Sequence, residues 1–289
     1  MRPVSGNFQY VSVPYNLTTD LPTLNNPTMI VMLTGWIDAS GAANAAMETL
    51  KGSHDTVLLA SFDPDMFIDY RARRPIMEIR DGINKSLNWS VPELYYGTDQ
   101  AGNDFVLLCG PEPDTSWVAF ATHVVDLAKR LKVRMMVGLG AYPYATPHTR
   151  PSRLSSTTPN LELRDAYGFL HNSVDVPAGV TAWLEHAFAD SGIPAISIWV
   201  QIPHYLSSGA YPAGTIALLQ SLTAVTGVIT PLEKLEYEAD QQREKLDHLV
   251  TANTEHVEML RQMEIAYDDE LPTGDDIAAE FEQFLRDNE

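Results

Sequence analysis

Two histidines, each preceded by a proline, are the residues of this sequence best placed to do chemistry. His148 lies in "TPHTRP" and His204 in "QIPHYL", and each stretch follows an apolar run. The prolines restrict the backbone beside His148, so its imidazole is held in one position, as a catalytic or binding loop requires. A metal site needs a third ligand, which no neighbouring spacing supplies. We therefore predict no metal and favour histidines that hydrogen-bond the loops together.

Arginines gather in two short stretches of the chain. "DYRARRP" holds Arg71, Arg73 and Arg74, and the loop of His148 adds Arg150 and Arg153. Forked guanidinium groups suit carboxylate or phosphate, so an anion site is one interpretation. The other, which we favour, is a set of structural ion pairs and contacts to backbone carbonyls, because polar loops need internal partners.

Asp38 and Ser40 follow the first apolar run, in "TGWIDASGAANAA". The carboxyl ends of parallel strands feed ligand crevices, so either side chain could lie in one. Either could also cap the helix that follows, and we favour the cap. The candidate binding residues for a crevice at the strand ends are Asp38, Arg73, Arg74, His148, Arg150 and His204. We assign a catalytic role to none of them.

Complete catalytic and cofactor motifs are missing from the sequence. It contains no phosphate-binding P-loop, no G-x-S-x-G elbow and no H-E-x-x-H pair. "GLG" at 138–140 lacks the third glycine and the following helix of a dinucleotide site. Cys109, the single cysteine, ends an apolar run, and we expect an inert core thiol there. We therefore predict no cofactor.

The elements that would position these residues alternate along the chain. Apolar runs predict buried strands at 29–36, 56–63, 104–110, 133–140 and 195–203, and helical patterns occur at 39–52, 115–132, 178–192 and 213–227. An extra strand, "IMEIR", lies in the irregular stretch from Asp63 to Gly97. Strands that lack alternation are buried on both faces. We predict a three-layer α/β domain over residues 1–231, with a mostly parallel sheet flanked by helices.

Residues 232–289 form a separate, acidic helical extension. They carry 18 acidic and 5 basic side chains, whereas residues 1–231 carry 20 and 14. Apolar residues recur at three- and four-residue steps, at Leu232, Leu235, Ala239, Leu246, Leu249, Leu260, Met263 and Tyr267. Gln242, Asn253 and His256 interrupt this stripe. We therefore expect a bent helical hairpin against the body or a neighbouring subunit, followed by a short helix at 275–288.

Composition limits the setting and the partners. The chain has 289 residues, of which 45% are hydrophobic, enough for a sizeable core. Its net charge of −19 repels phosphate backbones, so we predict no nucleic-acid partner. No apolar run approaches the roughly 20 residues that cross a bilayer, and the start lacks the apolar stretch of a signal peptide. With one cysteine and no disulfide within the chain, we expect a cytoplasmic protein without membrane contact.

Six segments resemble the bacterial branch of the proteasome assembly chaperone 2 family. They are "TGWIDASGAANAA", "DYRARRP", "GPEPDTSWVAF", "GLGAYPYATPHTRP", "WVQIPHYL" and "YPAGTIALL", in the family's order across residues 28–225. The resemblance implies a phosphorylase/hydrolase-like three-layer α/β fold and an oligomer. Eukaryotic and archaeal relatives help to assemble proteasome α subunits, and several end in a hydrophobic-tyrosine-any tripeptide. This chain ends Asp287-Asn288-Glu289, so we do not expect docking by that tripeptide.

Two functions remain open at this point. The first, which the resemblance and the acidic helical stripe favour, is a non-catalytic protein-binding or assembly-chaperone-like protein that takes its partner through the C-terminal helices. The alternative is a small-molecule-binding protein or a hydrolase/phosphorylase-like enzyme, with its site at the carboxyl ends of the strands. Arg73 and Arg150 would then clamp an anion.

Self-association and loop order are two further expectations. The resemblance and aromatic loops such as "SLNWSVPELYYG" favour a homo-oligomer, a trimer, held together through the α/β body. The loop of His148 should be ordered and partly buried, because its prolines reduce the entropy lost on folding. His148 and Arg150 should hydrogen-bond backbone or carboxylate groups of neighbouring segments.

Overall fold

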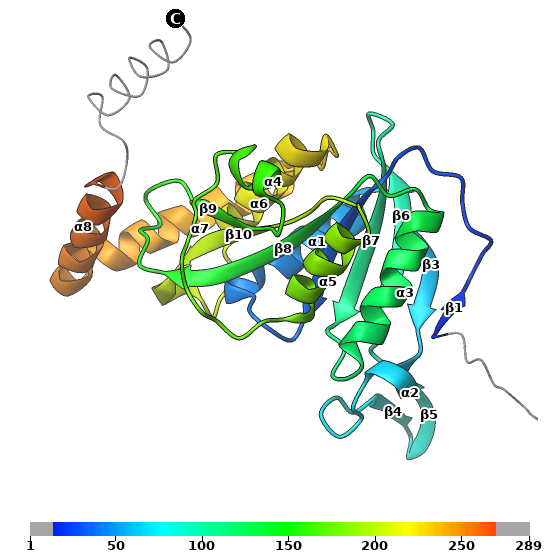
Figure 1. Ribbon diagram of the computed structural model, residues 1–289. Coiled ribbons are helices and arrows are strands. Elements are labelled where there is room, and N and C mark those ends of the chain that lie inside the picture. Colours follow the sequence, from blue (N-terminus) through cyan, green and yellow to red (C-terminus); the bar gives the residue numbers. More distant parts are fainter. Residues whose placement is uncertain (1–13, 270–289) are drawn as a thin grey trace, which may run out of the picture.

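The computed structural model describes residues 14–269, which build one large sheet covered by helices on both faces (Figure 1). The strand order is β1-β3-β6-β7-β2-β8-β10-β9. The strands are β1 Tyr15–Leu17, β2 Thr28–Thr34, β3 Val57–Phe62, β6 Glu93–Thr98, β7 Asp104–Pro111, β8 Met135–Tyr144, β9 Leu154–Thr157 and β10 Ala195–Pro203. The central strands β7, β2, β8 and β10 are parallel, and the outer pairs are antiparallel.

Helices cover both faces of this sheet, which explains the unbroken burial of its central strands. In β2 every residue from Thr28 to Leu33 is buried, and in β10 every residue except Trp199 is. Such strands lack alternation because neither face meets water. Helices α1 (Ala42–Ser53) and α6 (Pro212–Thr226) pack on one face, and α3 (Trp117–Arg130) and α5 (Val180–Asp190) pack on the other. The predicted three-layer α/β fold is confirmed.

Most of the shorter elements were not predicted from the sequence. The predicted extra strand is β4 (Ile76–Arg80), and it pairs with the unpredicted β5 (Ile83–Asn88) in a hairpin separate from the main sheet. Strand β6 lies in the aromatic stretch "SLNWSVPELYYG", for which the sequence predicts a loop, so that prediction is wrong for Glu93–Thr98. The remaining short helices are α2 Pro64–Phe67, α4 Leu161–Asp165 and the 3-10 turns η1 Ala39–Gly41 and η2 His204–Leu206.

Two helices, α7 (Glu233–Thr251) and α8 (Thr254–Asp269), follow the body. The chain bends between them at a predicted polar interruption, where Oδ1 of Asn253 accepts a hydrogen bond from the N–H of Glu255. This side chain satisfies a free backbone donor at the start of α8. At a second interruption, Nε2 of Gln242 donates to the carbonyl of Ala210 at 2.6 Å. The last predicted helix, 275–288, lies outside the described residues.

The apolar stripe of these helices faces the body, with one exception. Leu235 and Leu246 are half-buried, and Leu260 and Tyr267 are buried. Leu249 is 66% exposed, so its predicted place in the stripe is wrong. The half-buried Val250, four residues after Leu246, takes the inward position instead, as helical spacing allows. Within residues 14–269, no helix combines the length and the apolar content needed to cross a membrane.

Gly140 in β8 gives a stability prediction, because a Cβ at this position would collide with the ring of Trp199 on β10. We expect Gly140→Ala to lower the free energy of unfolding by about 1–3 kcal/mol, the usual cost of overpacking. Gly52, in α1, has open space at the Cβ position, so Gly52→Ala should instead raise the free energy of unfolding by about 0.5–1 kcal/mol. Urea denaturation measures both, and equal effects would contradict the prediction.

Candidate functional site

The loop between β8 and β9, residues 145–153, connects the sheet edge to the C-terminal helices. Its His148 side chain is buried, as expected. The hydroxyl of Tyr205 accepts the backbone N–H of His148 at 2.9 Å and lies 2.7 Å from Nδ1 of the same residue. The Tyr205 hydroxyl can then donate its own proton to Nδ1, an arrangement in which the proton of the neutral ring lies on Nε2. Nε2 lies 3.4 Å from Oδ1 of Asp247 on α7, without hydrogen-bond geometry.

The protonation state of this cluster follows from burial. Burial lowers the pKa of His148, and the neighbouring Asp247 carboxylate opposes that shift only in part. Burial also raises the pKa of Tyr205 to about 12, so its hydroxyl stays protonated and keeps its donor role. A general base needs a nitrogen that can reach a substrate proton. In His148 one nitrogen is engaged and the other is enclosed, so the ring joins the loop to η2 and to α7.

Arg150 fastens the same loop to α8. Its Nε and one terminal nitrogen donate to the two carboxylate oxygens of Asp268 at 2.9 and 2.8 Å, and its other terminal nitrogen lies 3.2 Å from Oε1 of Glu264. This bidentate geometry is the strong form of a guanidinium–carboxylate pair. It raises the pKa of Arg150 and lowers that of Asp268. Arg150 is thus paired with carboxylates of its own chain, in agreement with the ion-pair interpretation.

Four neighbouring contacts extend this attachment. The Arg153 guanidinium lies 3.8 Å from the ring centre of Tyr267 and donates to its carbonyl. The Tyr267 hydroxyl donates to the carbonyl of Pro151 at 3.0 Å, and the Thr149 hydroxyl donates to Glu264. Each residue of the loop from Thr149 to Arg153 except Ser152 therefore bonds α8 through its backbone or side chain.

The other four candidate residues have separate environments. Asp38 accepts the N–H groups of Ala43 and Asn44 at 2.9 and 3.0 Å, which is the favoured capping role at the start of α1. Arg73 pairs with Asp114 at 2.9 Å, while Arg74 and His204 are exposed. The structure therefore brings His148 and Arg150 together at the loop and leaves Asp38, Arg73, Arg74 and His204 outside this cluster. Of the six candidates, His148 and Arg150 line the groove described below, whereas Asp38 caps α1 and Arg73 pairs with Asp114.

The remaining reactive groups lie apart from the loop. Cys109 is buried in β7, and burial raises the pKa of its thiol to about 11, so the thiol is protonated at neutral pH. Within the described residues, no three His, Cys, Asp or Glu side chains gather closely enough to hold a metal ion.

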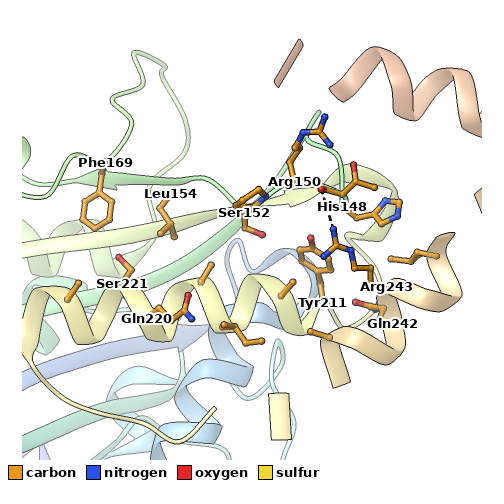
Figure 2. A pocket seen from close by; sticks show the side chains of 18 of the residues that line it. His148, Arg150, Ser152, Leu154, Phe169, Tyr211, Gln220, Ser221, Gln242 and Arg243 are labelled. Atoms are coloured by element: carbon orange, nitrogen blue, oxygen red, sulfur yellow. Dashed lines mark hydrogen bonds between the residues drawn. The ribbon is translucent and has the colours of Figure 1, made fainter. Parts of the chain in front are cut away.

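A groove runs beside the loop, along the outer face of α6 (Figure 2). Its volume is about 610 Å³. One face of α6 forms its floor, residues 148–154 with Tyr167 and Phe169 form one wall, and Ala239, Gln242, Arg243 and Leu246 of α7 border it on the other side. His148 and Arg150 line it, so two of the predicted residues lie at this site.

Sequence reasoning missed the groove itself. Its floor consists largely of small side chains, such as Ala213, Ala217 and Ala224, which also occur where a helix packs closely on a sheet. The walls come from segments up to about a hundred residues away in the chain. The α6 segment alone gave a sequence signal for the groove, because its apolar residues cover more of the helix than the face that packs on the sheet.

Fold and site define a three-layer α/β protein whose strand-end loop is fastened to its own C-terminal helices. The chain belongs to the PAC2 family, whose model matches residues 32–250. No curated protein matches the chain.

Solved structures extend this comparison. A Mycobacterium tuberculosis protein of unknown function is 35% identical, with a TM-score of 0.80, covering 88% of this chain and 91% of that one. A proteasome-assembly chaperone homologue of the same organism is 29% identical, with a TM-score of 0.75, covering 81% and 99%. An archaeal proteasome activator from Pyrococcus furiosus is 16% identical, with a TM-score of 0.62 over 81% and 97%, and so shares the fold.

The Arg150 attachment predicts how α8 responds to its loss. Arg150→Ala removes both carboxylate contacts, so we expect several-fold faster amide hydrogen exchange across residues 254–269. Arg150→Lys keeps the charge but not the fork, and should give an intermediate rate. Arg261→Ala, which removes a contact to Glu258 within α8 itself, serves as the control. Unchanged exchange in Arg150→Ala would contradict the attachment.

The buried His148 predicts a pH dependence. A histidine whose folded pKa is lowered stabilises the fold above its unfolded pKa of about 6.5, and that stability is lost as the pH falls through the folded pKa. His148→Asn keeps an amide near the Tyr205 hydroxyl but cannot take up this proton. The difference in free energy of unfolding between wild type and His148→Asn should therefore shrink below about pH 6.5. A difference that is constant from pH 8 to pH 5, measured by urea denaturation, would refute this.

Proposed function

We propose that this protein is a non-catalytic, assembly-chaperone-like protein that binds a protein partner through α7 and α8. The membership of the PAC2 family supports this proposal, together with the similarity to a proteasome-assembly chaperone homologue. The partner class is a protein with a basic surface, because residues 232–289 carry 18 acidic and only 5 basic side chains.

The observation that carries the proposal is a set of exposed apolar side chains on the two helices. Tyr237 and Leu249 of α7 and Val257 and Ile265 of α8 are large, apolar and exposed among acidic residues, and Val257 lines a hollow between the helices. The two helices are held on the body by the Arg150 and His148 contacts. An apolar surface rimmed by charge, on a rigidly attached element, is typical of a protein-binding surface.

An enzyme with its site at the strand ends is the less favoured candidate. His148 is enclosed, Arg150 and Arg73 are paired with carboxylates of the chain, and Asp38 caps a helix. A catalytic constellation needs groups that converge on a position where a substrate atom could lie. The observed contacts favour the use of these residues as supports for the binding surface.

The hairpin of β4 and β5 supports a further element of the proposal, self-association as a homotrimer. Ile76, 72% exposed, and Met77, Ile79, Ile83 and Leu87 are all exposed, so apolar side chains cover the hairpin and find no core. A lone two-stranded hairpin is at best marginally stable in water, and a covering subunit would supply the missing packing. Figure 1 shows the hairpin far from α8, so partner and subunit would use different surfaces.

Partner capture tests the first element. The full chain is immobilised and exposed to native extract beside a Tyr237→Arg/Leu249→Arg variant, which places two cations in the acidic apolar surface. We expect a protein retained by the wild type to be lost by this variant and kept by Leu161→Arg, the same change at an exposed position on α4. Identical partner sets for all three proteins would count against α7 and α8 as the binding surface.

Sedimentation tests the second element. At micromolar concentration we expect the wild type to sediment as a trimer and Ile83→Glu to sediment as a monomer, because a buried unpaired carboxylate opposes assembly. Leu161→Glu, at another exposed apolar position, should stay trimeric. A monomeric wild type would exclude self-association, whereas a trimeric Ile83→Glu variant would exclude only the hairpin.

A further inference from the structure

The floor of the α6 groove is one continuous face of that helix. The lining residues of α6 are spaced three and four apart, from Ala213 through Ala217 and Ser221 to Val225. At a rise of 1.5 Å per residue, this face is about 18 Å long. The opposite face of α6 packs on the sheet through Leu218 and Leu222, so the groove is built on a fully supported helix.

The two ends of the groove differ in charge. Leu154 and Phe169 lie toward one end, where uncharged Gln220 and Ser221 of α6 also line the groove, as Figure 2 shows. His148, Tyr211, Gln242 and Arg243 lie at the other end, as Figure 2 shows. An occupant that matches this gradient has an apolar body and a polar head at one tip.

Arg243 determines the charge of that head. Its guanidinium donates to the carbonyl of Thr149 at 3.4 Å, and among the described residues no carboxylate lies within ion-pair distance of it. Arg150, the residue that follows Thr149, is by contrast paired with both Asp268 and Glu264. In a highly acidic part of the chain, Arg243 thus presents a cation to the polar end of an apolar groove. Its complement is an anion.

The volume of the groove is in the range of small-ligand sites. Such sites measure about 300–1,000 Å³, and this groove measures about 610 Å³. A long acyl chain is narrow enough to lie within the groove along its whole length.

From these observations we propose that the α6 groove binds the anion of a free long-chain fatty acid. The acyl chain lies along Ala213–Val225, and the carboxylate accepts hydrogen bonds from Arg243. This site is distinct from the exposed apolar side chains of α7 and α8 proposed for a protein partner, so each can fail without the other.

Calorimetric titration of the delipidated full chain with palmitate, below its aggregation concentration, tests the site. We expect saturable binding by the wild type, and binding of octanoate at least tenfold weaker, because each lost methylene removes apolar contact. Arg243→Gln should weaken palmitate at least tenfold, since it removes a charge-assisted hydrogen bond. Arg261→Gln, the same change at an exposed position on α8, should bind like the wild type.

A second pair of variants locates the acyl chain. Ala217→Trp fills the middle of the floor and should abolish binding, and Ala224→Trp, at an exposed position of the same face, should do so if Ala217→Trp does not fold. Palmitate binding that survives a folded tryptophan variant would overturn the proposal. A second outcome would also overturn it. The wild type would not bind palmitate but would bind a peptide of residues 275–288, and the tryptophan variants would lose that peptide. The groove would then be the binding site of the chain's own C-terminal segment.

Discussion

The pairing of Arg150 with Asp268 and Glu264 is the interaction on which the arrangement of this molecule depends. Residues 232–289 and the rest of the chain both carry net negative charge, so at long range they repel each other. Helix α7 has no buried side chain and α8 has only two, Leu260 and Tyr267, so neither helix is held by a large apolar core of its own. A bidentate pair supplies local attraction together with fixed geometry. Position and orientation of α8 therefore follow from one short loop of the body.

In that loop, residue types that are also suited to catalysis hold separate segments of the fold together. Prolines restrict its backbone, His148 joins it to Tyr205 and Asp247, and Arg150 and Arg153 join it to α8. Most groups that a solvent-filled active site would leave free have a partner inside the chain, and Nε2 of His148 is enclosed beside Asp247 without hydrogen-bond geometry. The α/β body itself is shared with the solved structures of a proteasome-assembly chaperone homologue and of an archaeal proteasome activator, which is a likeness of fold.

Much of the fold could be predicted from the sequence, because β2, β7, β8 and β10 are unbroken apolar runs and α3 has a clear amphipathic pattern. Strands β1 and β9 could not, since they are short and lie at the sheet edges. His148 and Arg150 could be singled out by their loop. Their partners Asp247 and Asp268 could not, because about a hundred residues separate them and an acidic helix offers many equivalent carboxylates.

The two faces of helix α6 make different contacts. Leu218 and Leu222 pack on the sheet, whereas Ala217 and Ala224 line the groove, Ala217 at the edge of the same core. A change of side-chain size at the exposed Ala224 alters the depth of the groove with little effect on the sheet packing. Divergence among relatives can therefore tune what the groove admits at little cost in stability, and the fold gives no information about that choice. The sizes of a few small side chains on α6 would then set which ligand the groove of each relative admits.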